Sequence, residues 1–362
     1  MNEGTRRVRA ADLEAFVTAI FAAAGTSAED AATIAEVLVW ANLRGIDSHG
    51  VLRVPGYVGR IGSGEFNPRP DFAVLAELPA AIVIDADRAF GPVGMSRGMD
   101  TAVAKAREAG IGVCVVRRVT HMAAIGWFAL RAARQDMIGL VFGSSKPNMA
   151  YHGARARGVA TSPIAIAVPG MDREPILLDM ATSTGSMGRI MLARDRGTAL
   201  EPGVALTEDG EPTTDASAAR FLTPLGGAKG AGLSLMFECL TGVLVGNPLI
   251  AAALGPEGDW RHSQNGFALA IDIAAFTEPA RYRRDIDALV DALKALPPAR
   301  GNDEVRVPGE RGGRVMAERM ETGVPLPAGT WSRLAEVAAG LGVAMPAVIA
   351  AEAHSSSSRS LL

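Results

Sequence analysis

The sequence has little of the material from which metal centres, disulfide frameworks and aromatic cores are built. Its 362 residues include 2 cysteines, 5 histidines and 5% aromatic residues. Cys114 lies in an apolar run and Cys239 in a helical one, and neither has CxxC or HxxxH spacing around it. We therefore expect two buried free thiols, no metal site, and a core made of Ala, Val, Leu, Ile and Met.

A strong net charge and long apolar segments are lacking too. The formal net charge of -3 gives no electrostatic reason to expect nucleic acid or an anionic membrane as a partner. No uninterrupted run of about 18 apolar residues occurs, so no segment is expected to span a membrane. Arg6, Arg7 and Arg9 interrupt the start of the chain, which argues against a signal peptide. The expected compartment is the cytoplasm.

Two common nucleotide-binding signatures are absent. No G-x-G-x-x-G lies between a predicted strand and a helix, and no G-x-x-x-x-G-K-[ST] occurs. This argues against a Rossmann-type dehydrogenase, and a dinucleotide would have to bind some other glycine-rich backbone. What is present, 48% hydrophobic residues, 21% charged residues and 41 glycines, is typical of a globular, enzyme-like protein.

Hydrophobic periodicity predicts helices at both ends of the chain, with strands and helices alternating between them. The expected helices are 10–25, 27–44, 94–109, 185–194, 230–246, 283–296, 312–321 and 329–341, and the expected strands are 81–85, 112–117, 138–142, 164–168, 176–180 and 266–273. Residues 201–215, rich in Gly, Pro, Thr and Asp, are expected to form a surface loop. This alternation is typical of an α/β core between helical ends.

The stretch RGIDSHGVLRVPGY, residues 44–57, holds the densest set of reactive side chains. His49 lies beside glycines that let the chain turn between two helices, and an imidazole there can act as a general acid near neutral pH. Arg53, four residues later, can hold a carboxylate through two parallel hydrogen bonds. An acid beside a carboxylate anchor is what a 2-oxo-acid reductase needs. The alternative is a helix C-terminus with an incidental histidine.

Polar residues also follow three of the expected strands. His121 lies in a Thr-His-Met turn after strand 112–117, a common place for an active-site residue in α/β proteins, although it can equally satisfy a turn carbonyl. Ser145 closes the Gly-Ser-Ser segment that ends strand 138–142. Backbone amides and hydroxyls there can bind a carboxylate; the alternative is an ordinary serine-rich turn. Asp179 closes strand 176–180 and can bind a ribose hydroxyl or cap the following helix.

Two glycine-rich segments are candidate phosphate sites. Residues 225–232, LGGAKGAG, allow close backbone approach and place Lys229 just before a helix; the alternative is a flexible linker with a solvated lysine. Residues 307–311, VPGER, are a similar but poorer candidate.

Taken together, these blocks resemble one family. RGIDSHGVLRVPGY, GVCVVRRVTHMAAIGWFA, TSPIAIAVPG, LDMATS, KGAGLSLMFECLTGVLVG, GFALAIDI and VPGERG follow one another in family order across nearly the whole chain. They are similar to the malate/L-lactate dehydrogenase family, which also contains L-sulfolactate dehydrogenase, ureidoglycolate dehydrogenase, 2,3-diketo-L-gulonate reductase and Δ1-piperideine-2-carboxylate reductase. The resemblance implies an α/β, non-Rossmann nicotinamide-binding core with a mixed, largely antiparallel sheet. It also implies a homodimer whose active site lies between domains, near the partner subunit.

The resemblance assigns roles to particular residues. It places His49 and Ser48 at the reacting carbon and Arg53 on the substrate carboxylate, with His121 as a second candidate proton donor and Ser145 as a substrate contact. The positions that fall on NAD or NADP contacts are Asp179, Met180, Ala181, Thr182, Ser183, Lys229, Gly230, Gly309, Glu310 and Arg311. The sequence does not decide between the two cofactors, because Arg189, Arg194 and Arg196 are only loosely suggestive of a 2′-phosphate site.

The chain departs from the family pattern around the expected pocket. It has Thr120-His121-Met122 where Asn-His-Phe or Asn-His-Tyr is common, Thr161-Ser162-Pro163 where Thr-Asn-Pro is common, and an unusual segment at residues 146–149. The substrate therefore need not be malate or lactate. We expect an oxidoreductase acting at C2 of a small 2-hydroxy or 2-oxo acid. The alternatives are a reductase of a cyclic 2-imino acid and a non-catalytic nucleotide-binding sensor.

The expected domain division takes its first boundary from the Asn-Pro-Arg-Pro segment at residues 67–70. It assigns an N-terminal helical segment with His49 to residues 1–70, a substrate domain to 71–120 and an NAD(P)-binding domain to 121–300. Helices that return to the core follow at 301–352, and a disordered tail is expected at 353–362.

Overall fold

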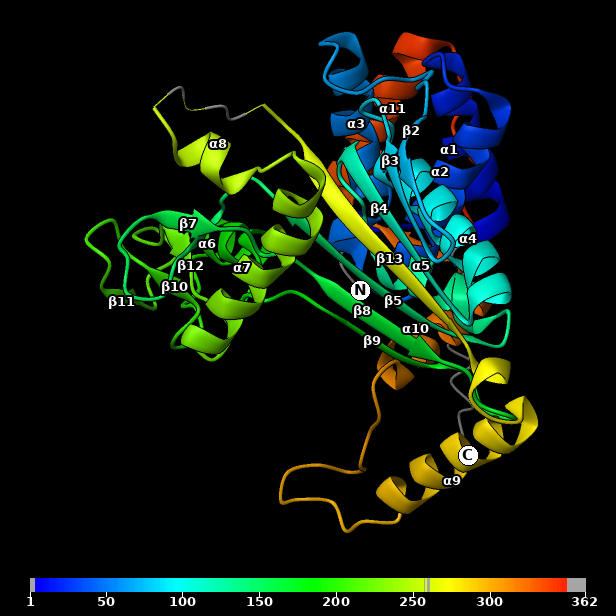
Figure 1. The fold of residues 1–362 in the computed structure, drawn as a ribbon. Coiled ribbons are helices and arrows are strands. Elements are labelled where there is room, and N and C mark those ends of the chain that lie inside the picture. The colour runs from blue at the N-terminus through cyan, green and yellow to red at the C-terminus, as the bar shows by residue number, and fades with distance from the viewer. Residues whose placement is uncertain (1–3, 257, 259–260, 350–362) are drawn as a thin grey trace, which may run out of the picture.

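The computed structural model describes residues 4–256, 258 and 261–349. The tail that we expected to be disordered, residues 353–362, lies outside the described residues. Figure 1 shows a long twisted sheet with helices on both faces, and a smaller β-rich lobe beside one end of that sheet.

The long sheet has seven strands, in the order β2-β3-β4-β13-β5-β8-β9. Their bounds are β2 Ala73–Glu77, β3 Ala81–Asp85, β4 Ile111–Val119, β5 Met137–Ser145, β8 Ile164–Val168, β9 Ile176–Met180 and β13 Gln264–Asp272. β3 and β4 are parallel, and every other neighbouring pair of these described strands is antiparallel. A mixed α/β fold is therefore confirmed, and its sheet is largely antiparallel.

Side chains along the central strands alternate between two differently covered faces. Gly139 of β5 faces α5 (Gly126–Ala133), and any Cβ at this position would overlap the Ala129 carbonyl oxygen. Phe142, three residues on, faces the opposite side, where its ring stacks on Phe237 of α7 (Ala228–Thr241) at 4.6 Å between centroids. One face of the sheet is thus closed by α5 and α4 (Gly91–Ala109), while α7 covers part of the other (Figure 1).

Helices from both chain ends pack around the first of these faces. They are α1 Ala10–Ala23, α2 Ala28–Leu43, α3 Val54–Gly62, α10 Glu310–Thr322 and α11 Ala328–Leu341. β1 (Arg6–Val8) pairs antiparallel with β14 (Val324–Leu326), which ties the two ends of the described chain together. Buried side chains of α1 and α2 form one continuous hydrophobic core with those of α4, α5 and the sheet. The boundaries of the expected domains remain a prediction.

The smaller lobe has a core of its own. Its five-stranded sheet has the order β11-β10-β12-β6-β7, and α6 (Met187–Arg196) packs beside it. Its strands are β6 Met149–Ala150, β7 Arg157–Val159, β10 Ala205–Leu206, β11 Pro212–Thr213 and β12 Phe221–Leu222. The prediction of a surface loop at 201–215 is wrong for Ala205–Leu206 and Pro212–Thr213, which pair as β10 and β11, and Ala205 is fully buried; the rest of the segment is irregular and mostly exposed. The short apolar run Val204–Leu206 outweighs the turn-rich composition around it.

Most of the other helices and strands expected from the sequence are present in the structure, some of them with ends that differ by a few residues. Strands 81–85, 164–168 and 176–180 have the predicted bounds, while the helix expected at 283–296 is α9, Pro279–Lys294. β2 was not expected, because all its residues are exposed and its sequence does not alternate. Cys114 is a buried free thiol as predicted, but Cys239 is only half-buried, so the prediction of burial is wrong for that residue.

One helical stretch is long and apolar enough to cross a membrane by length and composition alone. It covers Ala228–Val245, which is α7 with the following turn η3 (Val243–Val245), and has a mean hydropathy of 1.4 over 18 residues. This stretch is not an uninterrupted apolar run, because Lys229 and Glu238 lie inside it. A core helix of a soluble protein meets the same criterion, so this stretch alone is weak evidence for a span.

Candidate active site

A cavity of about 660 Å³ lies where the ends of β4 and β5 meet α3 and the chain that follows β9. This volume lies in the usual range of ligand pockets, roughly 300–1,000 Å³. The expected site residues that line it are Ser48, His49, Arg53, His121, Ser145, Ala181 and Ser183. Residues that are separated by more than 130 positions in the sequence therefore share one cavity.

His49 is placed by a short turn that leaves α2. Gly45 at φ +73° ends the helix, and the turn η1 (Asp47–His49) follows. The Asp47 carboxylate accepts hydrogen bonds from Asn42 at 2.6 Å and from Arg319 of α10 at 2.7 Å. Any Cβ at Gly50 would overlap the Asn42 amide, so the helix and the turn approach each other as closely as glycine allows. The His49 turn is thus fixed by α2 and α10.

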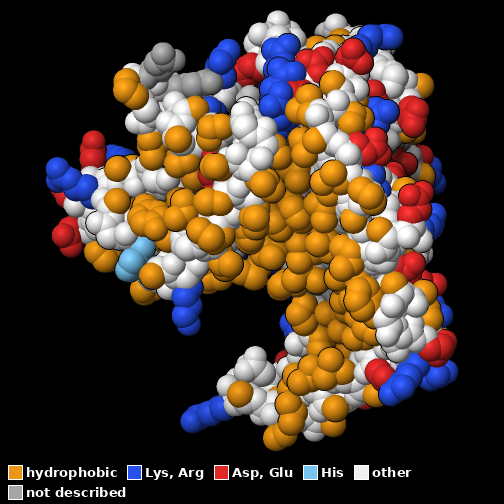
Figure 2. All heavy atoms as spheres, viewed as in Figure 1, with side chains coloured by type: hydrophobic (Ala, Val, Ile, Leu, Met, Phe, Trp, Pro, Cys, Tyr) orange, Lys and Arg blue, Asp and Glu red, His pale blue; other side chains and the backbone are white. Residues whose placement is uncertain are grey.

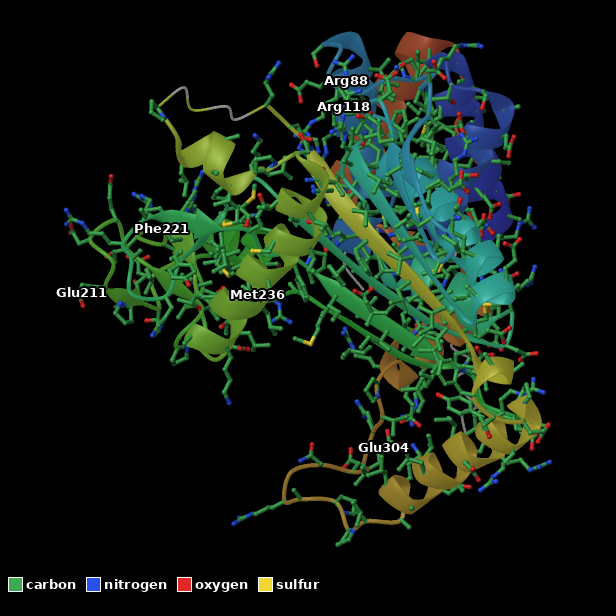
Figure 3. All side chains as sticks on the ribbon, in the orientation of Figure 1. Arg88, Arg118, Glu211, Phe221, Met236 and Glu304 are labelled. Atoms are coloured by element: carbon green, nitrogen blue, oxygen red, sulfur yellow. The ribbon has the colours of Figure 1, made fainter. Side chains whose placement is uncertain are left out.

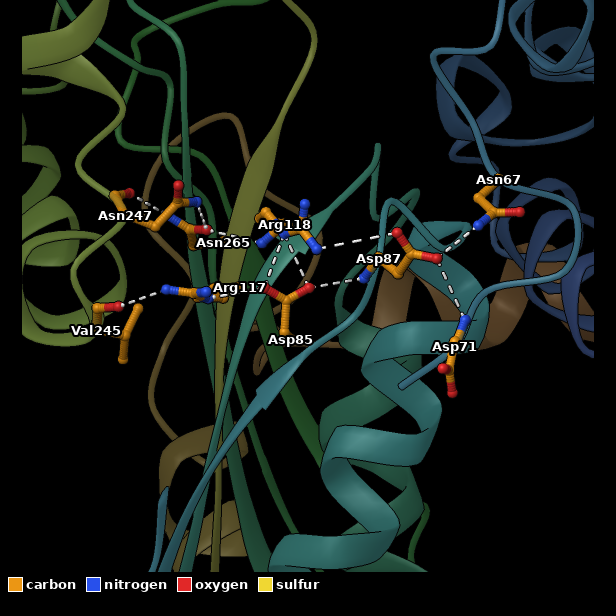
Figure 4. Close-up of polar contacts among 9 residues, drawn as sticks. All are labelled: Asn67, Asp71, Asp85, Asp87, Arg117, Arg118, Val245, Asn247 and Asn265. Carbon is orange, nitrogen blue, oxygen red and sulfur yellow. Dashed lines mark hydrogen bonds and ion pairs between the residues drawn. The ribbon is translucent and has the colours of Figure 1, made fainter. Parts of the chain in front are cut away.

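His121 is placed by the strained end of β4. Arg118 and Ala123, on either side of it, have φ values of +53° and +56°, a conformation that non-glycine residues rarely adopt. Arg118 is held by an ion pair to the buried carboxylate of Asp85 at 2.7 Å, and Arg117 joins the same carboxylate at 2.8 Å (Figure 4). Strain of this kind persists only where the surroundings enforce it, and it is common at functional sites.

Tyr57 of α3 holds the His121 ring. Its hydroxyl lies 2.6 Å from Nδ1 of His121 and 3.2 Å from the carbonyl oxygen of the same residue. The Ala123 backbone N–H also donates to Nδ1, at 3.2 Å. Because Nδ1 accepts from a backbone donor, the neutral ring carries its proton on Nε2. Nε2–H is therefore the ring group that can donate a hydrogen bond to a ligand.

The two expected catalytic imidazoles lie face to face. The rings of His49 and His121 are 5.5 Å apart between centroids, at an interplanar angle of 19°. The Ser48 hydroxyl lies 2.9 Å from Nδ1 of His49. Burial, and then the positive charge of Arg53, lower the pKa of His49 to about 4, and the same two causes hold the pKa of His121 well below its usual value. Both rings are neutral at physiological pH.

One nitrogen of the Arg53 guanidinium donates to the backbone, and the group lines the cavity. Its Nε donates to the Ser48 carbonyl oxygen at 2.7 Å, which leaves the two terminal nitrogens for a ligand in the cavity. A guanidinium held in this way can bind a carboxylate with two parallel hydrogen bonds. Ser145, half-buried at the end of β5, lines the same cavity.

The expected cofactor residues fall into three groups around β9, and most of them do not line the cavity. Asp179 is half-buried at the end of β9 and does not line the cavity; its carboxylate accepts the Gly126 N–H at 2.9 Å, and desolvation raises its pKa to about 6. Thr182 contacts the segment that leads into α7, because its carbonyl oxygen accepts a hydrogen bond from the Leu225 N–H at 2.8 Å. Lys229 and Gly230 lie in the first turn of α7, at that junction.

The third group begins α10. Gly309 has a φ of +98°, and its carbonyl oxygen accepts a hydrogen bond from Arg44 at 2.8 Å. Glu310 pairs with Lys294 at 2.6 Å through one carboxylate oxygen, and Arg311 follows it, exposed. The other Glu310 oxygen and the Thr182 hydroxyl are buried with no hydrogen-bond partner within the described residues. Such unsatisfied groups, beside close backbone approaches, fit a bound polar ligand.

Sequence reasoning missed three residues of this site. Tyr57 belongs to the 44–57 stretch and lies one helical turn after Arg53, so its spacing was an available signal. Arg60 continues the same face of α3. His262 also lines the cavity, but it lies in an irregular segment before β13, and no pattern in the sequence points to it.

One expected candidate has a structural role instead. Arg194, considered for a 2′-phosphate, donates hydrogen bonds to the carbonyl oxygens of Ala216 and Ala219. Across the described residues, no group of three or more His, Cys, Asp and Glu side chains is arranged to hold a metal ion.

Comparisons with known proteins agree with this architecture. A family model described as malate/L-lactate dehydrogenase matches residues 8–335. L-sulfolactate dehydrogenase of Methanocaldococcus jannaschii is 35% identical over 324 residues, covering 88% of this chain and 92% of that protein. Ureidoglycolate dehydrogenase (NAD(+)) of Escherichia coli K12 is 36% identical over 289 residues, covering 79% and 83%. The solved structure of malate dehydrogenase from Pyrococcus horikoshii OT3 matches with a TM-score of 0.86 at 32% identity, over 95% and 97% of the two chains. The chain therefore belongs to the malate/L-lactate dehydrogenase family.

Proposed function

We propose that the cavity is the active site of an oxidoreductase that transfers a hydride between a nicotinamide cofactor and C2 of a small 2-hydroxy acid. The protein is a dehydrogenase acting on hydroxy acids, as its family and relatives are. The observation that carries the assignment of the site is the pair of stacked neutral imidazoles, His49 and His121, in one cavity with Arg53.

Arg53 binds the substrate carboxylate and so orients the neighbouring C2. Its charge contributes to the lowered pKa of both imidazoles, so an anion bound to Arg53 offsets that charge and raises their pKa toward the range useful for proton transfer. His121, held at Nδ1 by Tyr57 and Ala123, presents Nε2–H to the substrate oxygen. His49, stacked on it, is the second candidate for moving the proton.

The cofactor residues surround β9. Asp179–Ser183, Lys229–Gly230 and Gly309–Arg311 would hold a dinucleotide, and the unsatisfied oxygens of Thr182 and Glu310 supply acceptors for its hydroxyl groups. When bound, the nicotinamide supplies or accepts the hydride. One relative is named for NAD(+), which supports NAD. Parallel titrations with NADH and NADPH decide between the two.

We also propose a homodimer formed through the open face of the long sheet. On this face the side chains of the two outer strands, β8 and β9, are apolar and half-buried: Ile164, Ile166, Val168, Ile176, Leu178 and Met180. Helix α7 adds Leu233, Met236 and Leu240 at 44%, 50% and 43% exposure. Figure 2 shows them as one broad apolar surface extending to α9, and Met236 is labelled in Figure 3. A contiguous surface of this kind marks an interaction site. Light scattering should give twice the chain mass, and Leu240→Glu should shift it toward one chain.

The test of the function is turnover. Reduced nicotinamide cofactor mixed with oxaloacetate, pyruvate, sulfopyruvate or piperideine-2-carboxylate should lose its ultraviolet absorbance with at least one acid. Conversion of the last alone would favour the cyclic 2-imino acid reductase. Tight cofactor binding without turnover across this panel would favour a non-catalytic sensor and contradict the proposal. A soluble enzyme of this class is expected in the cytoplasm.

A further inference from the structure

The cavity carries more positive charge than one substrate carboxylate needs. Its described lining residues include three arginines, Arg53, Arg60 and Arg157. Glu65 is the one acidic residue among the described residues that line the cavity. A surplus of this sign attracts a ligand with more than one negative charge.

Arg60 lies at the histidine end of the cavity. Arg53 immediately precedes α3, and Tyr57 and Arg60 follow it at spacings of four and three residues, so the three residues lie on one side of this helix. The charges of Arg53 and Arg60 both act on His121 and on His262, so the two guanidinium groups lie near the same imidazoles. The Arg60 guanidinium is also 5.5 Å from the ring centroid of Phe66.

His262 stands beside Arg60 with an unsatisfied nitrogen. Its ring lies 5.5 Å from that of Phe66, so Phe66 supports both side chains. Nε2 of His262 is buried and has no hydrogen-bond partner within the described residues. A buried nitrogen without a partner is unfavourable, and an oxygen of a bound anion would satisfy it.

We propose that Arg60 and His262 form a second anion subsite, so the substrate is a 2-hydroxy acid with a second acidic group. The inference rests on the proposed function, with Arg53 on the carboxylate beside C2 and Arg60 and His262 on the distal acid. A carboxylate oxygen of Glu65 lies 3.9 Å from the Arg60 Nε, and the side chains of Arg60 and Glu65 are 41% and 44% exposed. An exposed pair at this distance is weak, so a substrate acid can replace Glu65 at the guanidinium.

A matched pair of substrates tests the subsite. Oxaloacetate and 2-oxobutanoate share the 2-oxo acid end and differ in a distal carboxylate against a methyl group. The wild-type protein should favour oxaloacetate in kcat/KM. Arg60→Gln should reduce that preference by roughly 10- to 100-fold, the scale of one hydrogen bond to a charged group, and leave 2-oxobutanoate within about threefold. Arg107→Gln, the same change at an exposed site on α4 that does not line the cavity, should leave the preference unchanged.

A second variant gives a gain instead of a loss. Glu65→Gln removes the competing carboxylate, so it should increase the preference for oxaloacetate. Equal wild-type efficiency on both acids would overturn the subsite while leaving the dehydrogenase function in place. An increased KM of Arg60→Gln for the reduced cofactor with both acids would also overturn it, because Arg60 would then serve the cofactor. Reduction of no 2-oxo acid at all would overturn the proposed function itself.

Discussion

Replacing Tyr57 by Phe tests whether the hydroxyl on α3 positions His121. Tyr57 is 3% exposed, and its ring packs against Phe21, Phe66 and Phe90 at 6.4, 5.4 and 5.9 Å between centroids. Phenylalanine keeps this packing and removes only the contacts of the hydroxyl with His121, at 2.6 and 3.2 Å. The change is therefore confined to the orientation and hydrogen bonding of one imidazole.

The expected effect is large on turnover and small on stability. The Ala123 N–H still donates to Nδ1, so the imidazole is not left without a partner, and the free energy of unfolding should fall by about 1 kcal/mol. A ring that is no longer held in place should lower kcat by roughly 10- to 100-fold, because small misplacements of reacting groups cost up to about 10²-fold. KM for the acid should change little, since Arg53 is untouched.

Steady-state loss of cofactor absorbance gives kcat and KM, and urea unfolding gives the stability. The control is Tyr282→Phe, the same change on α9, whose ring has no contact with the cavity. A positioning role also predicts that the pH profile of kcat/KM shifts in Tyr57→Phe and not in Tyr282→Phe. If kcat and the pH profile of Tyr57→Phe both match the wild type, the hydroxyl does not position the catalytic imidazole.

Three further changes test how the site is built. Arg53→Ala should weaken binding of the acid by a few kcal/mol, the scale for breaking a buried charge pair, and unchanged kinetics would defeat its role as anchor. Gly50→Ala should destabilise the fold by roughly 1–3 kcal/mol, because the added methyl group overlaps Asn42, and an unchanged urea midpoint would contradict the close approach. Burial lowers the pKa of His262 to about 4, so the unfolded chain takes up its proton first as the pH falls below about 6.5, and folding loses up to about 2 kcal/mol by pH 5. His262→Gln should therefore reduce the acid sensitivity of unfolding, and an equal loss in both proteins would contradict the lowered pKa.

The sequence predicted the long sheet better than the small lobe, for a physical reason. Strands such as 164–168 carry buried side chains at every second position and apolar ones between, so a short apolar run marks them. In the lobe, β6, β10, β11 and β12 have two residues each, too few for any period to show. Pairing between distant segments, such as β12 with β6, is what forms these strands.

The site residues likewise fall into those that a sequence pattern predicts and those that it does not. His49 and Arg53 were found because their chemistry is concentrated within a few residues, and His121 because it follows a recognisable buried strand. His262 comes into the cavity through the path of an irregular segment, which local sequence does not encode. Lys229 was expected just before a helix, and it lies in the first turn of α7, which begins two residues earlier than predicted. The contact between Thr182 and Leu225, which brings this helix start beside β9, could not be predicted from the sequence.

At the histidine end of the cavity, nearby arginine charges disfavour protonation of the imidazoles when no ligand is bound. Three imidazoles are desolvated, and the charge of Arg53 makes their protonation still less favourable, joined at His121 and His262 by the charge of Arg60. An anion that neutralises these arginines removes that opposition, so the imidazoles should take up protons as the acid binds. Binding titrations of a non-reactive 2-oxo acid analogue in two buffers of different ionisation enthalpy should therefore show proton uptake near neutral pH. An analogue that binds with the same heat in both buffers would show that the arginine charges do not control the imidazoles.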